Sequence, residues 1–162
     1  MRDGTLCLLI RGNPPEQLLL GLKKQGFGAG KWGGFGGKIE TGETIAGAAV
    51  RELQEETGVK VCEENLQLMG HLTFVFPAKP AWNQVVYVFV AARWHGDPVE
   101  SAEMKPAWFA VDDIPYQRMW QDSIHWLPRI LSGERVQARF TFKGDNETID
   151  QIYITQWNGS GL

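Results

Sequence analysis

The chain has 162 residues, of which 43% are hydrophobic and 22% charged, and this composition predicts one globular domain over residues 1–162 with a substantial core. The formal net charge of −3 argues against nonspecific nucleic-acid binding, which normally needs a basic excess. Small anionic ligands remain compatible with this charge if a metal ion bridges them to the protein.

The two cysteines, Cys7 and Cys62, have no metal-ligand spacing, so the sequence indicates neither a disulfide framework nor a zinc site. The N-terminal apolar run over residues 6–10 is too short for a membrane span or the core of a signal peptide. We therefore expect a cytoplasmic protein without a membrane partner.

In chain order, β-propensity and turn residues predict two strands, a glycine-rich segment, a helix, three further strands, a second helix and a C-terminal hairpin. Asp122 or Ser123 is expected to cap the second helix, which Gly133 follows, and Gly144 to Asn146 supply the hairpin turn. The predicted strands cover 4–10, 17–23, 68–76, 84–94, 107–110, 135–142 and 147–154, and the predicted helices cover 44–57 and 122–131.

The glycine-rich segment consists of residues 26–30 and 33–37, on either side of Lys31 and Trp32. Such loops let the backbone approach a ligand closely, although simple turn formation explains many of them equally well. Their position directly before the first helix favours a ligand-binding role.

The first predicted helix carries Glu52, Glu55 and Glu56 at positions i, i+3 and i+4, so three carboxylates are expected on one narrow face. Either Thr41 or Thr44 can cap its start, and a left-handed cap is expected after residue 57. A solvated acidic face is the ordinary interpretation of such a cluster. Its density instead favours a hard divalent cation, for which Mg²⁺ is the natural candidate.

The spacing G-x5-E-x7-R-E-U-x-E-E-x-G-U, in which U is aliphatic, resembles the Nudix signature without a gap. The resemblance implies an α+β Nudix fold, in which a mixed β-sheet is packed between α-helices, and hydrolysis of a phosphoanhydride with Mg²⁺ or Mn²⁺. The matching residues are Gly37, Glu43, Arg51, Glu52, Leu53, Glu55, Glu56, Gly58 and Val59.

The resemblance also implies roles for the residues of this motif. Metal ligands would be the three helix glutamates and the carbonyl of Gly37, and one glutamate or a nearby one would act as general base, with the choice left open. Arg51 would orient a glutamate and Glu43 would support the helix start. Glu103 matches a further acidic position near the metals, with a plain surface carboxylate as the equal alternative.

Beyond the motif, the chain looks like the MutT-like members of the family that hydrolyse oxidised purine nucleoside triphosphates, such as 8-oxo-dGTP or 2-oxo-dATP, to the monophosphate and pyrophosphate. Gly33 and Ser123 depart from that pattern, which has an asparagine and an aspartate there, and this leaves the preference for oxidised purines open. The implied substrate-binding residues are Lys23, Phe27, Gly33, Phe74, Met104, Trp120 and Asp122.

Two alternatives remain at this stage. A Nudix pyrophosphohydrolase of the same chemistry could act on undamaged nucleotides or on RNA 5′ ends, although the composition shows no basic excess for long RNA. A non-catalytic nucleotide-binding Nudix module is the other alternative, which the intact acidic cluster disfavours. We expect a monomer whose partner is a small-molecule nucleoside triphosphate.

Overall fold

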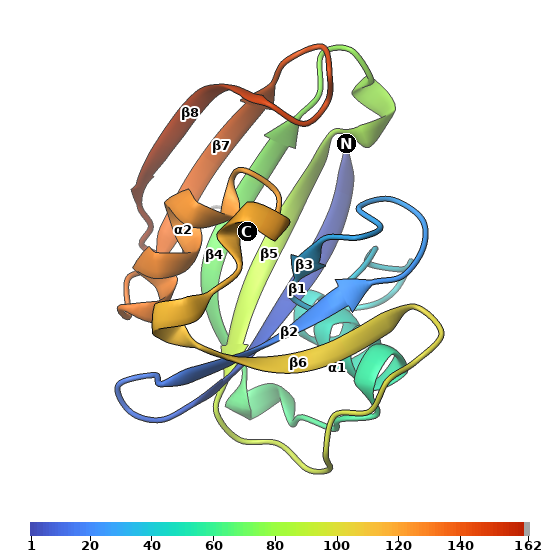
Figure 1. Ribbon diagram of the computed structural model, residues 1–162, viewed down its shortest axis with the longest axis vertical. Helices are drawn as coiled ribbons and strands as arrows, with labels where there is room; N and C mark the ends of the chain where they lie inside the picture. The colour runs from blue at the N-terminus through green and yellow to red at the C-terminus, as the bar shows by residue number, and fades with distance from the viewer. Residues whose placement is uncertain (161–162) are drawn as a thin grey trace.

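The computed structural model describes residues 1–160, so the last two residues of the predicted domain, 161 and 162, lie outside the described residues. An eight-stranded sheet forms the centre of the fold, and two α-helices pack against it (Figure 1). The elements are β1 (Arg2–Arg11), β2 (Gln17–Lys23), β3 (Trp32–Gly33), α1 (Ile45–Thr57), β4 (Gln67–Val75), β5 (Gln84–Ala91), β6 (Met104–Ala110), α2 (Ser123–Leu131), β7 (Val136–Phe142) and β8 (Ile149–Gln156).

The sheet is mixed, with the strand order β3-β2-β1-β5-β4-β7-β8, and β6 pairs with β2 outside this path. Strands β1 and β5 are parallel, as are β4 and β7, whereas the other neighbours are antiparallel. Strand β2 pairs with β1 only through its first residues but with β6 along its whole length. The sheet therefore forks at β2.

Alternate residues of β1 belong to two separate cores, one on each face of the sheet. Leu8 packs in a cluster with Leu127 of α2, whereas Leu9 packs in a cluster with Leu53 of α1. Because successive strand side chains point to opposite faces, the two helices cover opposite sides of the sheet. The predicted arrangement of a mixed sheet between helices is thus confirmed.

Helix α1 begins and ends as its sequence predicts. Thr44, rather than Thr41, is the N-cap, and its hydroxyl accepts a hydrogen bond from the Gly47 amide at 3.0 Å. Gly58 is the C-cap with φ of 78°, a left-handed conformation that glycine adopts without steric cost. These two local devices fix the register of the acidic residues between them.

One strand was missed and two predicted boundaries differ from the structure. The two-residue strand β3 was missed, because two residues within a glycine-rich run cannot show a period-2 pattern. Strand β5 ends at Ala91, three residues earlier than predicted, and β6 begins at Met104, three residues earlier. The remaining predicted strands and both helices agree within about two residues, the ordinary uncertainty of element ends.

The predicted cap of α2 is only partly correct. Asp122 occupies the N-cap position, but its side chain makes no capping hydrogen bond. Ser123 is the first residue of α2 and not its cap. Burial explains the difference, since Asp122 is only 4% exposed and its carboxylate bonds to a buried side chain instead. Within the described part of the chain, no helix is long and apolar enough to cross a membrane.

Candidate active site

A cavity of about 300 Å³ lies on the α2 side of the sheet, a size at the lower end for small-molecule sites. Its walls come from β1, β2, β4 and α2, from the glycine-rich segment and from the end of α1. All seven predicted substrate-binding residues line it, namely Lys23, Phe27, Gly33, Phe74, Met104, Trp120 and Asp122.

Aromatic rings form one end of this cavity. Phe27 stacks on Trp120 with ring centroids 5.1 Å apart and an interplanar angle of 27°. Trp82 meets the Phe27 ring edge-on at 4.5 Å, and Phe74 stacks on Phe140 at 5.7 Å. Flat aromatic faces at these spacings are suited to stacking on a nucleobase.

Asp122 is the buried acidic group of the aromatic end. Its Oδ2 atom accepts a hydrogen bond from the indole Nε1 of Trp126 at 2.7 Å. Burial raises the pKa of Asp122 from 3.8 to about 6, and the bond from Trp126 opposes that rise. The group therefore changes charge close to neutral pH, in the wall of the cavity.

Glu56 of α1 lines the same cavity, and this part of its wall is called the acidic end. The Glu56 carboxylate is 6% exposed and accepts a hydrogen bond from the Gly36 amide at 2.8 Å. Burial, followed by the negative charge of Glu52, raises the pKa of Glu56 to about 8, while Lys23 lowers it. The sequence predicts Glu56 on one narrow face with Glu52 and Glu55, and the structure shows that Glu56 is among the buried residues of α1.

Gly37 lies directly against the second acidic residue, Glu52. A Cβ atom at position 37 would stand 2.6 Å from the Glu52 Oε1 atom, so no other residue fits without displacing this carboxylate. The Gly37 carbonyl accepts a hydrogen bond from the Thr5 amide at 2.9 Å, which leaves one lone pair of this oxygen for another partner. Burial raises the pKa of Glu52 as well.

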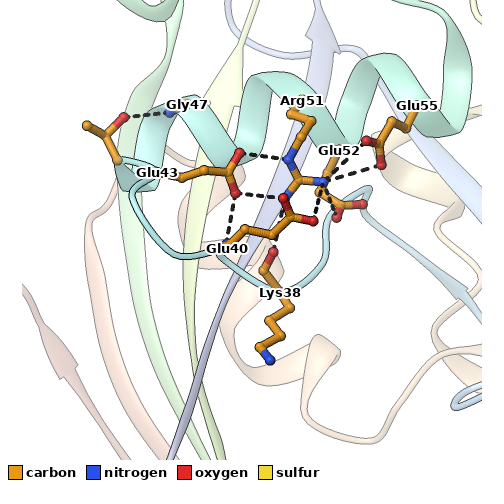
Figure 2. A network of polar contacts seen from close by, with 8 residues as sticks. Lys38, Glu40, Glu43, Gly47, Arg51, Glu52 and Glu55 are labelled. Atoms are coloured by element: carbon orange, nitrogen blue, oxygen red, sulfur yellow. Dashed lines mark hydrogen bonds and ion pairs between the residues drawn. The ribbon is translucent and has the colours of Figure 1, made fainter.

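Arg51 joins Glu43, Glu52 and Glu55 into a network beside α1 (Figure 2). Its Nε and Nη2 atoms donate to the two oxygens of Glu43 at 2.7 and 2.8 Å, a bidentate pair. Its Nη1 atom donates to Glu52 at 2.9 Å and lies 3.3 Å from Glu55. The hydrogen bonds from Arg51 lower the pKa of Glu43 to about 2, so Glu43 stays ionised.

The predicted acidic residues are not all equally close to the cavity. The Glu55 side chain is 58% exposed, against 15% for Glu52, and pairs with Arg51. Glu103 is exposed and outside the cavity wall, yet its charge raises the pKa of Glu52 and of Glu56, so it lies near both. Within residues 1–160, no three acidic, histidine or cysteine side chains form a ready metal cluster.

The donors nevertheless suit a hard divalent cation. Carboxylate and backbone carbonyl oxygens are the ligands that Mg²⁺ and Mn²⁺ prefer. Burial and then the charge of Glu52 raise the pKa of Glu56, so the two carboxylates repel each other. An ion would supply a balancing positive charge and draw the carboxylates together.

Thr5 is a cavity residue that the sequence analysis missed. It is 3% exposed, lines the cavity, and its Oγ1 atom has no hydrogen-bond partner. Trp82 and Trp126, which support the aromatic end, were also missed. A single threonine in an apolar strand carries no local signal, because only the pairing of β1 with its neighbours brings it to the cavity.

Fold, acidic helix and cavity together define a nucleotide hydrolase of the Nudix class, and the chain belongs to this family. Residues 1–130 match the NUDIX domain, and this range includes α1, Gly37 and all seven predicted substrate-binding residues. The predicted family membership is thereby confirmed.

Several individual members of the family are similar to this chain over most of its length. The chain is 44% identical over 145 residues to the oxidized purine nucleoside triphosphate hydrolase of Mus musculus, covering 90% of this chain and 88% of the mouse protein. The Danio rerio protein of the same description is also 44% identical, over 146 residues. Among solved structures, a MutT protein from Bacillus halodurans superposes with a TM-score of 0.81 and 26% identity, covering 95% of this chain and 97% of that one.

Proposed function

We propose that this chain hydrolyses purine nucleoside triphosphates, including oxidised ones such as 8-oxo-dGTP and 2-oxo-dATP, to the monophosphate and pyrophosphate. The observation that carries the proposal is the two-ended cavity. Aromatic rings that can stack on a purine and the carboxylate of Glu56 line one cavity. Lys23 lies in the same wall, lowers the pKa of Glu56 and can pair with phosphate. The relatives named above act on the same substrate class.

Mg²⁺, or Mn²⁺ in its place, would be held by Glu52, Glu56 and the Gly37 carbonyl, with Glu55 and Glu103 as further ligands. When bound, the ion would neutralise phosphate oxygens and lower the pKa of an attacking water. Arg51 holds Glu52 and Glu43 in fixed positions through its hydrogen bonds. Either Glu52 or Glu56, both next to the cavity, would accept the proton of that water.

Undamaged purine nucleotides are the second candidate substrate. Gly33 brings no side chain to the cavity wall, and no atom lies within 4 Å of where its Cβ would be. Ser123 brings a hydroxyl instead of a carboxyl group. With fewer side chains to hydrogen-bond a base, discrimination against normal purines is expected to be weaker than in a site built on such bonds.

A substrate panel tests the proposal. Purified protein is given dGTP, dATP, 8-oxo-dGTP, 2-oxo-dATP and a 5′-triphosphorylated RNA with Mg²⁺, and pyrophosphate and orthophosphate are measured separately. We expect pyrophosphate from the purine nucleotides and none after chelation of the metal. Orthophosphate as the only product, or turnover that survives the chelator, would contradict the proposal.

The same proposal includes a single domain over residues 1–162 that works as a cytoplasmic monomer on a small-molecule nucleotide. Sedimentation of the purified protein checks the monomer, and fractionation of cells that express it checks the location.

A further inference from the structure

The turn between β7 and β8 contacts the cavity wall, although it lies beyond residues 1–130, which match the NUDIX domain. Glu147 in this turn pairs with Lys31 of the glycine-rich segment, and its Oε1 atom lies 2.6 Å from the lysine Nζ. Lys31 lines the cavity, whereas Glu147 does not. The C-terminal hairpin therefore contacts one wall of the cavity from outside.

The same hairpin also bonds to the segment that precedes α2. The backbone amide of Ile149 donates to the Gln121 Oε1 atom at 3.0 Å. Trp120, the neighbour of Gln121, lines the cavity, and Phe142 at the end of β7 meets its ring edge-on with centroids 6.2 Å apart. Two polar contacts from one hairpin thus connect the glycine-rich segment and the segment that carries Trp120.

Trp120 is the ring that the glycine-rich segment packs against. The Lys31 ammonium lies 5.1 Å from the centroid of this ring, a cation–π contact, and Phe27 of the same segment stacks on the ring at 5.1 Å. A Cβ atom at Gly28 would stand 3.2 Å from the Trp120 Nε1 atom, so the backbone of the segment lies directly against the indole. A shift of Lys31 would therefore change the packing of Phe27 on Trp120.

Both partners of the ion pair stand on anchored backbone. Asp145 Oδ1 accepts hydrogen bonds from the amides of Glu147 and Thr148 at 2.9 and 2.8 Å, which fixes the turn. On the other side, the Lys23 amide donates to the Lys31 carbonyl at 3.1 Å, which fixes Lys31 beside the end of β2. The pair thus connects two anchored parts of the chain.

We propose that Glu147 is a positioning residue for nucleotide binding, which holds the glycine-rich segment against Trp120 by pairing with Lys31. The inference rests on the proposed function, since it needs a purine to bind between these residues and the rest of the aromatic end. Glu147 touches no substrate in this scheme and acts through Lys31. Because the pair lies at the aromatic end, it changes substrate binding and not the chemical step.

The test compares Glu147→Gln with a matched control, Glu100→Gln. Glutamine keeps the size of the side chain but removes the charge that pairs with lysine. Glu100 is also exposed and pairs with a lysine, Lys24, and neither residue of that pair lines the cavity. The affinity for deoxyguanosine is measured by calorimetry, and kcat and KM for dGTP by steady-state kinetics. Deoxyguanosine carries no phosphate, so its affinity does not respond to a change in net charge alone.

In Glu147→Gln, we expect the affinity for deoxyguanosine to fall and KM for dGTP to rise, both about 2- to 5-fold, the scale of an exposed ion pair, with kcat unchanged. Glu100→Gln leaves all three values unchanged. An unchanged deoxyguanosine affinity in Glu147→Gln, an equal change in both variants, or a fall in kcat without a rise in KM would overturn the proposal.

A charge reversal tests whether Glu147 acts through Lys31. Lys31→Glu and Glu147→Lys each bring two like charges together, and each is expected to weaken deoxyguanosine binding more than Glu147→Gln does. The double variant has an ion pair of the opposite sense and should recover part of the loss, whereas no recovery contradicts the proposal. Absence of pyrophosphate release by the wild type refutes the proposed function separately, because deoxyguanosine binding needs no turnover.

Discussion

The two ends of the cavity differ in how the chain builds them. The acidic end comes from one helix and the loop before it, so Gly37, Arg51, Glu52 and Glu56 lie within 20 residues of one another in the sequence. The aromatic end gathers Phe27, Phe74, Trp120 and Asp122 from three separate parts of the chain. The residues proposed to carry the hydrolysis are therefore close together in the sequence, whereas those proposed to bind the base come together only when the chain folds.

This comparison predicts that substitutions at the acidic end change kcat and substitutions at the aromatic end change KM.

Replacement of Glu56 by Gln should have the largest effect. The amide keeps the shape of the side chain and its bond to Gly36 but removes the negative charge needed to hold a cation or accept a proton. We expect kcat to fall by about 10³-fold or more, roughly 4 kcal/mol of barrier. Pyrophosphate release at saturating dGTP measures this, with the exposed Glu64→Gln as control. Unimpaired turnover by Glu56→Gln would remove Glu56 from the mechanism.

Arg51→Lys should have the next largest effect. Lysine keeps the positive charge but cannot donate to both oxygens of Glu43 and to Glu52 at once. We expect kcat to fall about 10- to 100-fold, the usual loss when a residue that orients a metal ligand is changed. The control is Arg129→Lys, which alters a similar ion pair between Arg129 on α2 and Glu134 beyond the end of that helix. Equal activity of the two variants would mean that Arg51 only stabilises α1.

Trp120→Ala tests the aromatic end. Loss of a stacking ring costs about 1–3 kcal/mol per base, so KM for dGTP should rise about 5- to 100-fold with a smaller change in kcat. Trp94→Ala serves as control, since Trp94 stacks on Trp108 in the core on the other face of the sheet. Steady-state kinetics separates the two constants. A fall in kcat without a rise in KM would contradict the expectation that the aromatic end serves substrate binding.

Asp122→Asn is expected to change the stability of the fold with pH, which is the smallest of these effects. Because the folded-state pKa is raised from 3.8 to about 6, the folded protein binds this proton more tightly than the unfolded chain. The resulting stabilisation is present below pH 3.8 and is lost as the pH rises to about 6. The variant has no such group, so its melting temperature relative to the wild type should rise by several degrees between pH 4 and pH 7.

Calorimetric scans at both pH values measure this difference. A difference in melting temperature that stays constant with pH would mean that Asp122 is not the group that titrates near pH 6.

By itself, the sequence determined the helix α1 with its left-handed C-cap, the family, the mixed sheet between helices and the seven predicted substrate-binding residues that line the cavity. Caps and acidic spacing are local, so fourteen or so contiguous residues suffice to specify them. The aromatic and apolar cavity residues were identified only through resemblance, because core packing explains each of them equally well.

Only the tertiary structure decided which carboxylates face the cavity. Helical spacing places Glu52, Glu55 and Glu56 on one face, but Glu56 is buried, whereas Glu55 is exposed and pairs with Arg51. The unpaired Thr5 hydroxyl and the Asp122–Trp126 bond likewise depend on burial. Burial is a property of contacts between distant segments, and local spacing therefore does not encode it.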